Sequence, residues 1–328
     1  MSLPQVGIVC GSGLSELSKA LEGPTMTAMY GDIPGFPSHC TVAGHKGEIV
    51  FGYLGGVPTM CFRGRFHTYE GHDMQTAVLP VRVMRCLGVK VVIITNAAGG
   101  LNPNYSVGDV VTVSDHLAIP MLAGKNPLVG MNDDELGPRF PPTSNAYPEM
   151  LQRVAHRAAA ELDFPFVQKG AATYCFVSGP NYESKAECRF LRNSAGGDCV
   201  GMSTVPEIVA AHHSGMKVLC LSLITNKVLF EGTEGPDASH EEVLEAVQER
   251  SVQLQTLVKM IVSIFDKEVL PSLPDLPPVT LDVVLGPNKS SSPSSCSAKL
   301  LLGIPVHCWM QSAALLAAGI VIGTRIQK

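Results

Sequence analysis

QVGIVCGSGL, residues Gln5–Leu14, joins a short β-branched apolar run to a glycine-rich loop. Two further segments repeat this pattern, KVVIITNAAGGL at residues 90–101 and KVLCLSLITNKV at residues 217–228. Near-continuous apolar runs of this length are typical of strands that have both faces of their sheet covered. The three segments therefore predict central strands of a buried sheet.

Helical patterns lie between these strands. They are AVLPVRVMRCLG (77–88), YPEMLQRVAHRAAAEL (147–162), ESKAECRFLRN (183–193) and a long segment that begins at residue 240. Ser184 with Glu187, and Ser239 with Glu242, have the spacing of capping boxes. Strands that alternate with helices predict an α/β fold in which helices cover the sheet.

Composition narrows the function classes. The formal net charge is only −5 and no block of Lys or Arg occurs, so charge predicts neither a nucleic-acid surface nor an anionic-membrane surface. Ten Cys are scattered without a C-x-x-C pair or metal-ligand spacing. This pattern favours a reducing compartment, argues against a zinc site or disulfide framework, and predicts thiols that serve as small core hydrophobes. The first residues carry no basic region of a secretory signal, so we expect a cytoplasmic protein.

Polar residues gather where the predicted strands end. Ser12 lies in the GSG loop after the first strand, and GRFHTYEGH at residues 64–72 places Arg65 and His67 after the apolar run VPTMC. A glycine-rich loop, a guanidinium and an imidazole together favour a small bound phosphate. Each residue also has a structural interpretation: an ordinary glycine turn, a solvated charge and a buried imidazole.

Seven motifs carry a family resemblance. VCGSGL, GRFHTYEG, TNAAGGLNP, SGPNYESKAEC, GMSTVPE, SLITNKV and SHEEVL follow one another between about Pro4 and Phe265. Together they resemble the trimeric purine nucleoside phosphorylases that act on 6-oxopurines. The resemblance implies a single α/β domain, with a mixed central β-sheet flanked by helices on both faces, that assembles as a homotrimer. The implied reaction is phosphorolysis of inosine or guanosine, and their deoxy forms, to the free base and (deoxy)ribose 1-phosphate.

The resemblance also assigns residues. Ser12, His45, Arg65, His67, the backbone at Ala97, and Ser203 match the family's phosphate ligands. Tyr69, Phe140, Tyr182, Glu183, Val200, Met202, Asn226, His240 and Val243 match its purine and ribose pocket, with Phe140 closing over the sugar of a neighbouring subunit. Asn226, Glu183, His67 and His240 match its catalytic positions. The family needs no metal and no cofactor, because inorganic phosphate is a co-substrate.

The chemistry explains these residue types. Breaking the glycosidic bond leaves positive charge on the ribose and negative charge on the departing purine, so the pocket must stabilise both. Asn226 can donate to the purine and Glu183 can accept from the ring N–H of a 6-oxopurine, although Glu183 also suits the first turn of a helix. A phosphorylase for methylthioadenosine, which carries Asp where this chain has Asn226, is the alternative enzyme. A non-catalytic nucleoside-binding paralogue is the other alternative.

The ends of the chain depart from the family pattern. The expected phosphorylase domain spans residues 1–266 and lacks the usual helix before its first strand. Residues 267–299 form a Pro- and Ser-rich linker, and residues 300–328 a hydrophobic tail without charge from Leu300 to Gly323. That tail fits a membrane anchor, a docked helix, or a product of splicing or of an imperfect gene model. Tyr182 replaces a frequent Phe and adds a hydroxyl that needs a partner.

Overall fold

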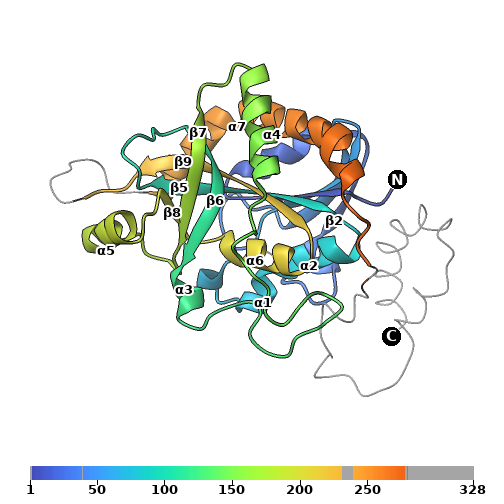
Figure 1. The fold of residues 1–328 in the computed structure, drawn as a ribbon, viewed down its shortest axis with the longest axis horizontal. Helices are drawn as coiled ribbons and strands as arrows, with labels where there is room; N and C mark the ends of the chain where they lie inside the picture. The colour runs from blue at the N-terminus through green and yellow to red at the C-terminus, as the bar shows by residue number, and fades with distance from the viewer. Residues whose placement is uncertain (1, 39, 231–238, 278, 280–328) are drawn as a thin grey trace.

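One mixed sheet of nine strands organises the molecule (Figure 1). The computed structural model describes residues 2–38, 40–230, 239–277 and 279. The strands are β1 (Val6–Cys10), β2 (Glu22–Met29), β3 (Glu48–Leu54), β4 (Val57–Arg63), β5 (Val91–Gly100), β6 (Val110–Ala118), β7 (Val167–Phe176), β8 (Cys199–Gly201) and β9 (Lys217–Lys227). Their order in the sheet is β2-β3-β4-β1-β5-β8-β7-β6-β9.

The three strands predicted from the apolar runs lie side by side. β1 pairs parallel with β5 from Val6↔Val91, and β5 pairs parallel with β9 from Val91↔Lys217. Since β9 also pairs antiparallel with β6, strands β5, β8, β7, β6 and β9 close into a barrel. The mixed central sheet is confirmed, and the closure of half of it into a barrel is an addition that strand patterns alone did not predict.

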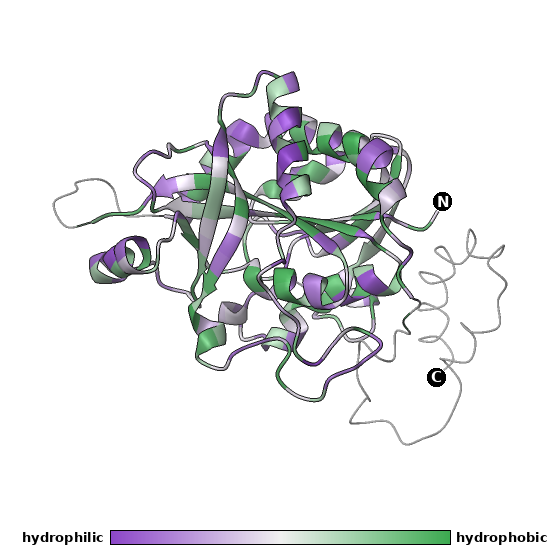
Figure 2. Ribbon diagram, in the orientation of Figure 1, coloured by the Kyte–Doolittle hydropathy of each residue, from purple (hydrophilic) through white to green (hydrophobic). Residues whose placement is uncertain are grey.

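Helices cover both faces of the sheet. They are α1 (Met74–Ala77), α2 (Leu79–Cys86), α3 (Ile119–Leu122), α4 (Glu149–Glu161), α5 (Lys185–Arg189), α6 (Val205–His213) and α7 (His240–Ile264). Helices α4 and α7 lie on one face, and α1, α2 and α6 on the other (Figure 1). Two large core clusters correspond to these two faces. In Figure 2, α4 carries polar residues along much of its length.

The predicted helix starts are confirmed. Ser184 Oγ accepts from the backbone N–H of Glu187 at 3.3 Å, and Glu187 Oε2 accepts from the N–H of Ser184 at 2.8 Å, which completes the capping box of α5. Ser239 Oγ accepts from the N–H of Glu242 at 3.2 Å at the start of α7. The apolar stripe of α7 is buried as its helical spacing predicts.

The packed chain continues beyond α7. A π-helical turn, η5 (Phe265–Val269), and a 3₁₀ turn, η6 (Leu270–Ser272), follow it, and Val269 and Leu270 are buried in the same cluster as α7. Leu273 and Leu276 also pack against the core, so the packed chain extends past the expected boundary at 266. Most of the expected linker and all of the tail at 300–328 lie outside the described residues. Within the described part of the chain, no helix has both the length and the apolar character needed to cross a membrane.

The described cysteines are free thiols. Cys10, Cys61, Cys175, Cys188, Cys199 and Cys220 are buried, while Cys40 and Cys86 are half-buried. For these residues the prediction of small core hydrophobes is confirmed.

Candidate active site

A glycine loop connects β1 to the 3₁₀ helix η1 (Leu14–Ala20) and presents Ser12. A Cβ atom at Gly11 would lie 2.8 Å from both Asn96 Cα and the Thr95 carbonyl oxygen, so only glycine lets the loop pack on β5. Gly13 has φ 72°, a backbone conformation that side chains disfavour. These two glycines hold Ser12 at the edge of the sheet where β1 ends.

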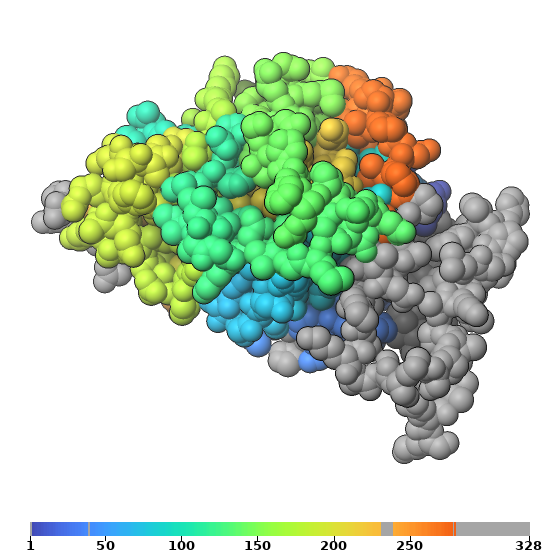
Figure 3. Space-filling model, turned by 60° about the horizontal axis from the view of Figure 1, so that its bottom comes forward, coloured from blue at the N-terminus to red at the C-terminus, as the bar shows by residue number. Residues whose placement is uncertain are grey.

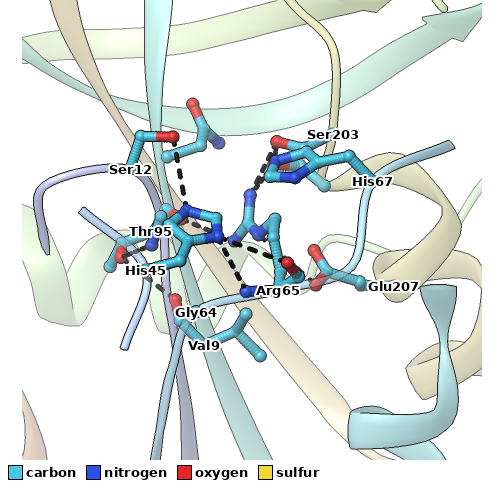
Figure 4. A network of polar contacts seen from close by, with 12 residues as sticks. Val9, Ser12, His45, Gly64, Arg65, His67, Thr95, Ser203 and Glu207 are labelled. Atoms are coloured by element: carbon cyan, nitrogen blue, oxygen red, sulfur yellow. Dashed lines mark hydrogen bonds and ion pairs between the residues drawn. The ribbon is translucent and has the colours of Figure 1, made fainter. Parts of the chain in front are cut away.

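Arg65 is the centre of the polar network in Figure 4. It follows β4 and is only 1% exposed. Its Nη2 donates to the Thr95 carbonyl oxygen at 2.7 Å, and its Nη1 donates to Ser203 Oγ at 2.6 Å and Thr204 Oγ1 at 3.0 Å. The guanidinium is therefore fixed by β5 and by the turn that begins α6.

His45 connects Arg65 to the glycine loop. Its Nδ1 lies 3.2 Å from the backbone nitrogen of Arg65, and its Nε2 lies 3.3 Å from Ser12 Oγ. In the tautomer whose Nδ1 accepts from that backbone N–H, Nε2–H donates to Ser12. Burial, followed by the nearby His67 and Arg65, lowers the pKa of His45 to about 3, so the ring is neutral near pH 7.

His67 is oriented by Glu70. Glu70 Oε1 accepts from the ring Nδ1 and from the backbone N–H of His67, each at 3.0 Å, while Glu70 Oε2 accepts from the N–H of Thr41 at 2.9 Å. Burial opposes ionisation of Glu70, but these hydrogen bonds outweigh it and hold its pKa well below the ordinary value. Burial lowers the pKa of His67 despite the neighbouring carboxylate. The His67 ring stacks on His45 and Tyr69, with centroids 5.1 and 4.5 Å away.

Glu207 lies behind Arg65 in the first turn of α6. It is 3% exposed, and its Oε1 is 3.5 Å from Arg65 Nε. Burial raises the pKa of Glu207, and the charge of Arg65 and the backbone of Thr204 offset this only in part. Thr204 has φ 80°, an uncommon conformation for a residue with a side chain, at the point where it contacts Arg65.

Val200 and Asn226, two of the residues predicted to contact the purine, lie together at the end of β5. Gly99 pairs with Val200 of β8 and Asn226 of β9. A Cβ at Gly99 would lie 3.3 Å from Val200 Cγ1 and 3.4 Å from Asn226 Nδ2. Glycine at this position therefore lets the Val200 and Asn226 side chains both lie close to the backbone of β5. Ala97, predicted to offer its backbone to phosphate, lies two residues earlier on the same strand and is half-buried.

Met202 and Glu183 line two neighbouring hollows. Met202 borders a small cavity together with Arg65, His67 and Ser203. Glu183 borders a larger one of about 350 Å³, between α3 and the segment that follows β7. Burial raises the pKa of Glu183. Tyr182, next to Glu183, is 42% exposed.

The remaining predicted residues line neither of these two cavities. His240 and Val243 occupy the first turn of α7; Val243 is buried, and the His240 Nε2 atom is buried without a hydrogen-bond partner among the described residues. Phe140 is 87% exposed in the loop between α3 and α4, which Figure 3 shows in green on the surface. The structure therefore does not bring Phe140 into the pocket of its own chain.

Four residues of the network were not assigned from the sequence: Glu70, Thr95, Thr204 and Glu207. All four stand inside motifs that were recognised, GRFHTYEG, TNAAGGLNP and GMSTVPE, but the types of Glu70, Thr204 and Glu207 suit helix starts and surfaces equally well. Thr95 contacts Arg65 through its carbonyl oxygen, which every residue has, while its hydroxyl donates to the Val9 carbonyl oxygen at 3.0 Å and accepts from the N–H of Gly11 at 3.4 Å.

Comparisons with known proteins identify a family and relatives of the chain. The model of the family described as the phosphorylase superfamily matches residues 5–263. Purine nucleoside phosphorylase of Bos taurus is 45% identical over 261 residues, which cover 79% of this chain and 89% of the relative. Two crystal structures of Schistosoma mansoni purine nucleoside phosphorylase each match with a TM-score of 0.75. The complex with inosine is 39% identical and covers 83% of this chain and 92% of its own. The complex with adenosine is 41% identical, and the match covers 80% of this chain and 91% of the Schistosoma chain.

Proposed function

The chain belongs to the purine nucleoside phosphorylases of the phosphorylase superfamily, and we propose that it cleaves 6-oxopurine nucleosides with inorganic phosphate. The products are the free purine base and ribose 1-phosphate, or deoxyribose 1-phosphate from a deoxynucleoside. The observation that carries the proposal is the convergence of Ser12, His45, Arg65 and Ser203 in one hydrogen-bonded network at the strand ends.

Phosphate has a suitable site in this network. Arg65 provides the positive charge, and Ser12 and Ser203 provide hydroxyl donors. Ser203 Oγ accepts from Arg65 Nη1 and lies 3.0 Å from Thr204 Oγ1, so when Thr204 donates in that contact the Ser203 proton is available for an anion. His67 donates its Nδ1–H to Glu70, so its Nε2 is free to accept a hydrogen bond from the hydroxyl of hydrogen phosphate. A phosphate held here would stabilise the cationic ribose carbon and then form the new bond to it.

The purine end rests on Asn226 and Glu183. In our proposal the Asn226 amide donates to the ring as negative charge develops there, and the Glu183 carboxylate accepts from the ring N–H of hypoxanthine or guanine. Tyr182, Val200 and Met202 contribute contact surface to the base and sugar. Asn226 at the position where methylthioadenosine phosphorylases have Asp favours 6-oxopurines. The Schistosoma relative is solved with adenosine as well as inosine, so selectivity needs direct measurement.

We further propose a homotrimer with shared active sites. The loop between α3 and α4 exposes Val129, Met131 and Phe140, and Leu122 at the end of α3 is 78% exposed. Such a group of exposed apolar side chains is typical of an interface. Placing Phe140 over a neighbour's ribose would bury that side chain and complete the neighbour's pocket, together with its His240 and Val243. The free thiols favour a reducing compartment such as the cytoplasm.

Hypoxanthine release from inosine tests the function. Purified protein should release hypoxanthine only when phosphate is present, and should act less efficiently on adenosine and methylthioadenosine. Preference for methylthioadenosine would support the alternative enzyme. Nucleoside binding without turnover in a folded trimer would support the non-catalytic alternative.

A further inference from the structure

Glu207 is a buried carboxylate that the proposed reaction does not use. The described residues give neither carboxylate oxygen a well-formed hydrogen bond, although the backbone N–H of Thr204 is close enough to lower the pKa of Glu207. Arg65 Nε also lacks a hydrogen-bond partner among these residues, and it lies 3.5 Å from Oε1. Buried carboxylates normally fill their hydrogen-bonding capacity. The pair thus forms a charge contact without a hydrogen bond.

Helix capping accounts for Glu207 only in part, through the backbone of Thr204. Thr204 and Glu207 have capping-box spacing at the start of α6, but the Thr204 side chain makes no cap hydrogen bond. Its hydroxyl accepts from Arg65 instead. Ser184 and Glu187 on α5 form both bonds of such a box and lie at the surface, which shows the geometry that the α6 pair lacks.

Neutral groups already fix the position of Arg65. The Thr95 carbonyl oxygen, Ser203 Oγ and Thr204 Oγ1 accept three of its hydrogen bonds. Glu207 adds no directed bond to this arrangement, so its contribution is charge. In the absence of an anion, the negative charge of Glu207 balances that of Arg65, which a buried guanidinium requires.

We propose that Glu207 is a charge-balancing residue that sets the affinity for phosphate. A dianion that enters the network shares Arg65 with Glu207 and is repelled by it. Glu207 therefore weakens the binding of phosphate and of ribose 1-phosphate, and it keeps the buried site neutral between turnovers. This inference rests on the proposed function, because it assumes that Arg65 binds phosphate.

Glu207→Gln tests the charge with little change of shape. Titration calorimetry with inorganic phosphate alone should give a Kd at least about threefold lower than that of the wild type, since a unit charge acts over a few ångströms at low dielectric. The KM for phosphate should fall in parallel, while the KM for inosine at saturating phosphate stays within about twofold. Glu207→Asp, which keeps the charge, should retain wild-type phosphate affinity. Glu187→Gln, the same change at a surface capping box, should do likewise.

Weaker or unchanged phosphate binding by folded Glu207→Gln would overturn the inference. If this variant folds only when phosphate is supplied, the inference is supported, because phosphate then replaces Glu207 as the counter-charge of Arg65. Failure to fold with and without phosphate would assign Glu207 a structural role and overturn the inference. A wild-type protein that binds no phosphate would instead overturn the proposed function.

Discussion

Glu70 accepts two hydrogen bonds from His67, one from the ring Nδ1 and one from the backbone N–H, each 3.0 Å long. This pairing places the proton on Nδ1 and leaves Nε2 as the atom that can reach a ligand. The orientation of one site residue is therefore decided by a residue three positions later.

Glu70→Gln should disturb phosphate use more than nucleoside use. The amide oxygen can take the place of Oε1, which accepts both His67 bonds, but the amide NH₂ cannot accept from the N–H of Thr41 as Oε2 does. The negative charge is also lost, and a charge-assisted bond contributes about 1.5 kcal/mol or more. We expect kcat/KM for phosphate to fall about tenfold. Steady-state kinetics with phosphate varied would check this. Glu161→Gln, at the exposed end of α4, serves as the control. An equal loss for inosine and phosphate would contradict the role assigned to Glu70.

His45 should make stability dependent on acid pH. Its pKa is lowered to about 3 in the folded protein, mainly by burial, so the unfolded chain binds a proton that the folded chain refuses. Stability from this group is fully present above pH 6.5 and is lost as the pH falls from 6.5 toward 3. Urea unfolding without phosphate should therefore show a shallower decline for His45→Asn than for the wild type between pH 6.5 and 5. Parallel curves would contradict burial of a neutral His45.

Asn226→Asp should shift selectivity toward 6-amino nucleosides. A carboxylate accepts from an exocyclic amine and repels a carbonyl oxygen. We expect the ratio of kcat/KM for inosine to that for adenosine to fall at least about tenfold, within the range that unpaired polar groups produce. Asn226→Ala should reduce both activities without this shift. If Asp and Ala variants lose inosine and adenosine activity equally, Asn226 does not contact the base.

Phe140→Ala should raise the KM for inosine and leave phosphate binding unchanged, because its side chain is exposed in its own chain. Co-expression with Arg65→Ala provides a test of shared sites. Some mixed trimers would contain a pocket with Arg65 from one subunit and Phe140 from another, so activity should exceed that of either parent. Native mass spectrometry checks co-assembly. Confirmed mixed trimers without added activity would show that Phe140 acts within its own chain.

The sequence predicted the central strands, and polar residues at their ends, for a physical reason. Buried strands leave continuous apolar runs, and the loops that follow them carry polar groups without apolar neighbours, as around Ser12 and Arg65. Closure of the barrel left no comparable signal, because the β5–β9 and β6–β9 pairings depend on contacts distant in sequence. Glu207 was not predicted as a site residue, because a glutamate that follows Thr204, Val205 and Pro206 is typical of the first turn of a helix. Its role depends on Arg65, 142 positions earlier.

The identity of the sugar product tests the central claim most directly. Inosine and phosphate should be incubated with the protein in water enriched in ¹⁸O, and the products followed by ³¹P NMR and mass spectrometry. We predict that hypoxanthine and ribose 1-phosphate form in equal amounts, that the sugar carries no ¹⁸O from water, and that neither product forms without phosphate. Free ribose labelled with ¹⁸O, or hypoxanthine release that is independent of phosphate, would identify a hydrolase and contradict the account.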